Sequence, residues 1–156
     1  MASDPGGLDE IDKERPLVVD NSVMMRWLFD DGSLADRRYA ASVLETIQAQ
    51  NLQVIVPNIW VYESSFVVSY YFNQHVLPVA DARRHLEYLF DVCTVISDGV
   101  TPAALFEVSR LHRISTYDAA YVLLAQNHVC SLATLDKKMR RVARKLDIAI
   151  ALEKSR

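Results

Sequence analysis

Leu17-Val18-Val19-Asp20-Asn21-Ser22 is the stretch that decides the fold of this chain. Three apolar residues run directly into a carboxylate, an amide and a hydroxyl, and apolar residues at helical spacing follow from Val23. This order predicts a buried strand that ends at Asp20. Parallel α/β sheets bind ligands beyond the carboxyl ends of their strands, so we expect Asp20 at such an edge.

Strand and helix signals alternate along the rest of the chain. We expect strands over 17–20, 53–56, 94–96, 129–135 and 148–152, with helices between them. This alternation predicts a three-layer α/β/α domain over 16–152, with a mainly parallel sheet of about five strands. Residues 1–15 hold five acids against two bases and few apolar residues, so they are expected to form a disordered tail.

Length and composition favour a single domain without a membrane segment. The chain has 156 residues, 51% of them hydrophobic, a net charge of −3 and no apolar run of the ~20 residues that a membrane span needs. It begins without a secretory signal pattern, so we expect a cytoplasmic protein. Its two cysteines have neither C-x-x-C spacing nor a histidine partner, which favours reduced thiols.

Four acidic residues are expected to meet at the carboxyl edge of the sheet. Asp20 and Asp136 each follow a predicted strand, Asp118 begins a helix at that edge, and Glu63 lies early in the helix after the second strand. Structural explanations exist for three of them: Asp20 and Asp136 could cap helices, and Asp118 has capping-box spacing from Ser115. Glu63 fits such an explanation poorly, because an unpaired carboxylate buried in an apolar helix costs several kcal/mol.

A cluster of this kind requires a cation or bound protons. Two like charges ~4 Å apart repel by about 4 kcal/mol at an effective dielectric constant near 20. An all-oxygen ligand set favours Mg²⁺ or Mn²⁺ over zinc. Ser22 and Thr134 each lie two positions from an acid, so their hydroxyls either hold the carboxylates or satisfy local backbone. A carboxylate-held Mg²⁺ suits phosphodiester hydrolysis, with Asp118 or Glu63 holding the attacking water as general base.

Basic residues follow Asp136 directly. Six of the next nine positions are Lys or Arg. A solvated helix face is the ordinary interpretation, but the neighbouring acids make this helix a candidate for contact with a nucleic-acid backbone. The candidate RNA-binding residues are Lys137, Lys138, Arg140, Arg141 and Arg144. A second helix, predicted over 59–72, is apolar on nearly every side, so we expect one of its faces to pack on a partner chain.

Four segments together resemble the PIN domain and, within it, the VapC-type ribonuclease toxins of toxin–antitoxin pairs. They are Asp20-Asn21-Ser22, Pro57 leading to Glu63, Ser115-Thr116-Tyr117-Asp118-Ala119-Ala120-Tyr121 and Leu132-Ala133-Thr134-Leu135-Asp136. The resemblance runs from about Leu17 to Ile150 and puts Asp20, Glu63, Asp118 and Asp136 on the acidic positions of the family.

The resemblance implies an endoribonuclease that depends on Mg²⁺ or Mn²⁺, is often a homodimer and is inhibited by a small antitoxin covering the acidic pocket. Many relatives carry a further acid where this chain has Lys138, which argues against a second metal. Two alternatives stay open. One is a PIN-like module that binds RNA or protein without cleavage. The other is a receiver-type phosphoacceptor domain, which requires adjacent acids after the first strand and a lysine after the last; this chain has Asp20 alone and no such lysine before Lys154.

Overall fold

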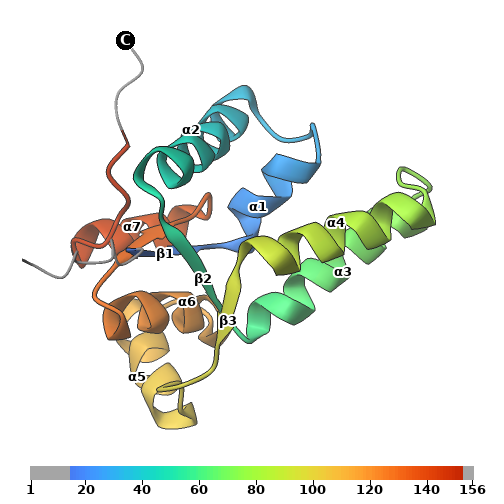
Figure 1. Cartoon of the computed structure of the whole chain (residues 1–156). Helices are drawn as coiled ribbons and strands as arrows, with labels where there is room; N and C mark the ends of the chain where they lie inside the picture. Colours follow the sequence, from blue (N-terminus) through green and yellow to red (C-terminus); the bar gives the residue numbers. More distant parts are fainter. Residues whose placement is uncertain (1–14, 153–156) are drawn as a thin grey trace, which may run out of the picture.

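The computed structural model describes residues 15–152, and in this part of the chain one parallel sheet of four strands is flanked by helices. The strands are β1 (Pro16–Val19), β2 (Gln53–Pro57), β3 (Thr94–Ile96) and β4 (Ser131–Ala133). They lie in the order β3-β2-β1-β4 (Figure 1). The register pairs Val18 with Ile55 on one side and with Leu132 on the other, so β1 is a central strand buried from Leu17 onward.

Seven helices accompany the four strands in the described residues. They are α1 (Asn21–Leu28), α2 (Leu34–Gln50), α3 (Ile59–Asn73), α4 (Val79–Val92), α5 (Pro102–His112), α6 (Thr116–Asn127) and α7 (Lys137–Lys145). The chain moves outward from β1 to β3 and then returns past β1 to β4. With right-handed crossovers, α1 to α4 therefore cover one face of the sheet and α5 and α6 the other (Figure 1). The predicted three-layer α/β/α fold is confirmed.

Helix α6 lies against three strands and supplies much of the core. It packs on β1, β2 and β4, and its residues 119–125 are all buried. A helix without a polar stripe is stable only when covered on several sides, here by the sheet and by α5. This packing fixes the first turn of α6, with Asp118, at the edge where β1 and β4 end.

The prediction of a fifth strand over 148–152 is wrong. In the described chain that segment makes one isolated parallel bridge, between Leu132 and Ala149. It lies beside β4, which is only three residues long, so its pairing is limited to the hydrogen bonds around Leu132. The fourth strand is also shorter than predicted at both ends, and its later start follows from Val129, which adopts a φ of 48° that extended backbone cannot have. The tail predicted over 1–15 falls, apart from Arg15, outside the described residues.

Helices α3 and α4 form a hairpin that projects from the sheet (Figure 1). Trp60, Ser64 and Val68 form the buried side of α3. Its opposite side carries Tyr62 and Phe66, which are 73% and 71% exposed. Within residues 15–152, no helix combines the length and the apolarity that crossing a bilayer requires.

Candidate active site

A cleft of about 460 Å³ lies where the central strands end, and all four predicted carboxylates line it. Each comes from a different element: Asp20 follows β1, Glu63 is in α3, Asp118 begins α6, and Asp136 precedes α7. The other lining residues are Asn21, Ser22, Met25, Arg26, Asp36, Val67 and Leu135. The structure thus brings together acids that are up to 116 positions apart in the sequence.

Asp20 is the most deeply placed of these acids, at 6% exposed. It stands at the N-cap position of α1, yet its side chain makes no capping hydrogen bond. Its Oδ2 instead accepts hydrogen bonds from Ser22 Oγ at 2.7 Å and Thr134 Oγ1 at 2.8 Å. Both hydroxyls therefore hold the carboxylate in one orientation toward the cleft, and helix capping does not explain Asp20.

Glu63 is held by a buried tyrosine. The hydroxyl of Tyr121, a residue of α6 with no exposed surface, donates a 2.6 Å hydrogen bond to Glu63 Oε1. Burial raises the pKa of Glu63, and the charges of Asp20 and Asp118 raise it further, while the Tyr121 hydrogen bond lowers it. The half-buried carboxylate on this apolar helix thus has both a partner and a place in the site.

Asp118 and Asp136 each lie at the start of a helix. The Asp118 backbone N–H donates to Ser115 Oγ at 3.0 Å, and Asp136 Oδ1 accepts from Met139 N at 2.8 Å, so Asp136 does cap α7. The positive ends of three helix dipoles therefore face the cleft, those of α1, α6 and α7. Each such end stabilises a nearby carboxylate by about 0.3–1 kcal/mol, less than the repulsion of about 4 kcal/mol between two ionised carboxylates ~4 Å apart.

Burial is the largest cause that raises the pKa of the acids in the cleft, and neighbouring carboxylates add to it. Burial raises the pKa of Asp20, and the charge of Asp118 raises it further against the two hydroxyl hydrogen bonds. Burial also raises the pKa of Asp118, with the charge of Asp136 acting in the same direction, while Ser115 and Lys138 oppose the rise. Three of the four carboxylates are therefore harder to ionise than usual, which is the condition that a bound cation relieves.

The donor set fits a hard divalent cation. The four carboxylates and the hydroxyls of Ser22 and Thr134 offer oxygen, and Asn21 Oδ1 adds a buried amide oxygen that has no hydrogen-bond partner among residues 15–152. No three of the described His, Cys, Asp or Glu side chains are close enough together to form a ready-made metal cage. The site is therefore a cleft lined with oxygen ligands, in which Asp20, Asp118, Asp136 and Glu63 are the residues available to hold the ion.

The predicted RNA-binding residues differ in their surroundings. Lys137, Lys138, Arg141 and Arg144 are exposed on α7. Arg140 is half-buried: its Nε and Nη2 donate to the Thr134 carbonyl at 3.3 and 3.2 Å, and its guanidinium lies 4.5 Å from the centre of the Tyr39 ring. Arg140 therefore fixes the segment between β4 and α7 against α2, a contact that the sequence did not indicate.

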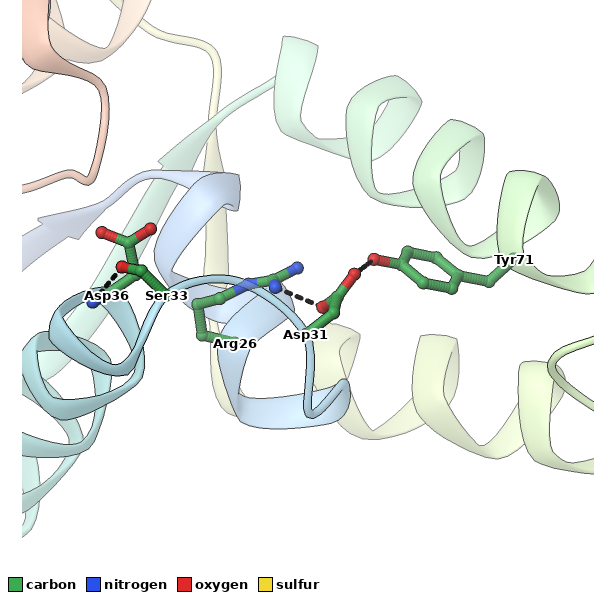
Figure 2. A network of polar contacts seen from close by, with 5 residues as sticks. All are labelled: Arg26, Asp31, Ser33, Asp36 and Tyr71. Carbon is green, nitrogen blue, oxygen red and sulfur yellow. Dashed lines mark hydrogen bonds and ion pairs between the residues drawn. The ribbon is translucent and has the colours of Figure 1, made fainter.

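Three residues at or next to the cleft were missed by sequence analysis: Arg26, Asp36 and Tyr121. Asp36 lies in the first turn of α2, where its backbone N–H donates to Ser33 Oγ at 3.1 Å, as Figure 2 shows. Tyr121 was named only as the end of a family-like segment, without a role of its own. Arg26 lies one helical turn after Ser22, and that spacing was the one signal that placed it on the same face of α1.

Comparisons with known proteins agree with this geometry. The PIN domain family profile matches residues 17–145, which include all four carboxylates. The crystal structure of PAE2754 from Pyrobaculum aerophilum is similar, with a TM-score of 0.63 at 18% sequence identity over 81% of this chain and 78% of that chain. At this identity the likeness concerns the fold alone. No curated protein matches the sequence.

Proposed function

This chain belongs to the PIN domain family, and from that membership we propose that it is a Mg²⁺- or Mn²⁺-dependent endoribonuclease that hydrolyses RNA phosphodiester bonds. PIN domains are typically nucleases and generally use divalent metals, so the membership supports a nuclease role. The observation that carries the proposal is the single cleft lined by Asp20, Glu63, Asp118 and Asp136, which come from four separate elements.

Asp20, Asp118 and Asp136 are the proposed metal ligands, with Glu63 as a further ligand or as the base. When bound, the ion supplies a water of lowered pKa and stabilises charge on the phosphate oxygens. The hydrogen bonds from Ser22 and Thr134 keep Asp20 in place before any ligand arrives. Little side-chain entropy is then lost on binding.

Glu63 is suited to accept a proton from the attacking water. Burial raises its pKa toward the range useful to a general base, and the Tyr121 hydrogen bond occupies Oε1, which leaves Oε2 for the water. The water oxygen bonds to phosphorus, its proton passes to the carboxylate, the phosphorus–oxygen bond to the leaving nucleotide breaks, and the leaving oxygen takes up a proton from solvent water. Asp118 is the alternative base. No covalent intermediate with the protein is required.

The basic helix α7 is proposed to hold the RNA backbone beside the cleft. It begins directly after Asp136, and Lys137, Lys138, Arg141 and Arg144 are exposed along it. Lys138 is close enough to Asp118 to lower the pKa of that carboxyl group. A positive charge there favours one bound metal ion over two.

As the finer part of the proposal, the chain is a VapC-type toxin that forms a homodimer and is inhibited by a cognate antitoxin covering the cleft. The exposed aromatic side of α3 supports the dimer, because contiguous apolar patches mark interaction surfaces. Phe66→Asp is expected to give monomers by light scattering at concentrations where the wild type is dimeric. A short protein encoded beside this chain, with a DNA-binding N-terminal half, is the expected antitoxin.

Cleavage of an RNA panel by the purified full chain, free of any antitoxin, tests the enzymatic proposal. With Mn²⁺ the wild type is expected to cut at least one RNA, EDTA to stop it, and Asp20→Asn to abolish it. Asp98→Asn, which removes an exposed acid outside the cleft, is the matched control and should keep full activity. RNA that is bound but left intact by the wild type with Mn²⁺ would identify a non-catalytic PIN-like binding module instead.

A further inference from the structure

Arg26 supplies the positive charge among the residues that line the cleft. Five lining residues are acids, namely Asp20, Asp36, Glu63, Asp118 and Asp136. Even with one divalent ion bound, the five carboxyl groups outnumber the three positive charges of that ion and Arg26. An RNA phosphate entering the cleft is therefore repelled unless a fixed cation offsets the excess, and Arg26 in the last turn of α1 is placed to do so.

Arg26 is held in position by Asp31. Its Nη1 donates to the Asp31 carboxylate, which in turn accepts from the Tyr71 hydroxyl of α3, and Figure 2 shows Asp31 between the two. Gly32, with a φ of 88°, leaves the space that Arg26 needs, because a Cβ there would lie 2.9 Å from Nη1. With 13% of its side chain exposed, Arg26 is already ordered before a ligand binds.

The pairing with Asp31 leaves part of the guanidinium for another acceptor. Arginine has five N–H donors in a rigid planar fork, and the hydrogen bond to Asp31 uses Nη1. The Nε and Nη2 donors match two oxygens of a phosphate group. We propose that Arg26 forms a phosphate subsite at the α1 side of the cleft, which binds an RNA phosphate next to the scissile one. This inference rests on the proposed ribonuclease function.

Salt-dependent RNA binding by the full chain tests the subsite. A fluorescent single-stranded RNA that the wild type cleaves is titrated with Asp118→Asn protein in Mg²⁺, a background chosen to prevent cleavage. Arg26→Gln is added in one arm and Arg110→Gln in the other. Arg110 is the matched control, since it also pairs with one acid, Glu107, but lies on α5 outside the cleft.

We expect Arg26→Gln to weaken RNA binding by about tenfold or more and to reduce the slope of log K against log salt by about 0.7, the value for one phosphate contact on a single strand. Arg110→Gln should change neither. Arg26→Lys should keep the slope and lose part of the affinity, because it keeps the charge and loses the fork. Equal affinity and slope for Arg26→Gln and Arg110→Gln would overturn the inference.

Two further measurements distinguish a folding defect in the variants from the loss of the phosphate contact. Melting curves give the folded fraction of each variant, and a purely structural role for Arg26 would lower that fraction without altering the salt slope. If Arg26→Gln does not fold, Arg26→Lys decides: wild-type affinity for this variant would overturn the fork-to-phosphate contact. Failure of the wild type to cleave any RNA would reject the ribonuclease function, and the same titration with a single-stranded RNA that the wild type binds would still report on the subsite.

Discussion

Tyr121→Phe isolates the hydrogen bond that holds Glu63. The substitution keeps the ring in the core and removes a hydroxyl that donates to Glu63 Oε1 at 2.6 Å. A hydrogen bond to an ionised group contributes about 1.5–3 kcal/mol. In metal-free buffer at about pH 7, the free energy of unfolding is therefore expected to fall by about 2 kcal/mol, which lowers Tm by about 4–8 °C for a domain of this size.

The pH dependence of that loss identifies its cause. The Tyr121 hydroxyl lowers the pKa of Glu63 against the larger effect of burial, so its stabilisation is present when Glu63 is ionised and is lost as the pH falls through the Glu63 pKa. The Tm difference between the wild type and Tyr121→Phe should shrink in acid. Tyr117→Phe, which removes an exposed hydroxyl from the same helix, should change Tm very little. A Tyr121→Phe protein that melts like the wild type at neutral pH would refute the reasoning.

Three further predictions concern charge, metal and backbone. Asp20→Asn should raise the metal-free Tm in differential scanning fluorimetry. Because burial raises the pKa of Asp20, the wild type should lose stability as the pH rises from the usual 3.8 through the raised pKa. The Tm difference between Asp20→Asn and the wild type should therefore widen over that pH range. Mg²⁺ at ~100 times its Kd should stabilise the wild type by about 2.7 kcal/mol and Asp20→Asn far less, and identical melting with and without Mg²⁺ would contradict the site. Val129→Gly should raise the free energy of unfolding, measured with urea, by about 1 kcal/mol, since Val129 is 91% exposed and has a φ of 48°. Val129→Ala keeps the unfavourable φ, so its free energy of unfolding should rise little.

Much of the fold was predictable because its signals are local. The strand leading to Asp20 is a short apolar run followed at once by polar residues, and the hydroxyl of Ser115 marks the start of α6 in both sequence and structure. The meeting of the four acids at one edge followed from parallel topology, since all carboxyl ends of such a sheet lie together. The prediction of a fifth strand failed because its neighbour β4 is only three residues long and forms a single bridge with it, which the apolar content of 148–152 does not reveal.

The contacts around the acids were not predictable, because they join residues far apart in sequence. The hydroxyl of Tyr121 finds its partner 58 positions away, and a tyrosine in a run of buried apolar residues has no local signal of that partner. Arg140 lies in a strongly basic helix and looked like its neighbours, yet its guanidinium packs on the Tyr39 ring. Such contacts depend on how helices are placed across the sheet, which a single sequence does not specify.

The position of β1 between β2 and β4 has a consequence for biosynthesis. The second neighbour of this strand and the last carboxylate, Asp136, are translated about 116 residues after Asp20. At about 5–20 residues per second, the ribosome needs roughly 6 to 23 s to cover that distance. Throughout this interval the nascent chain has one edge of its first strand unpaired and one wall of its cleft missing. Any chemistry at this cleft therefore begins only after the chain has been made through Asp136.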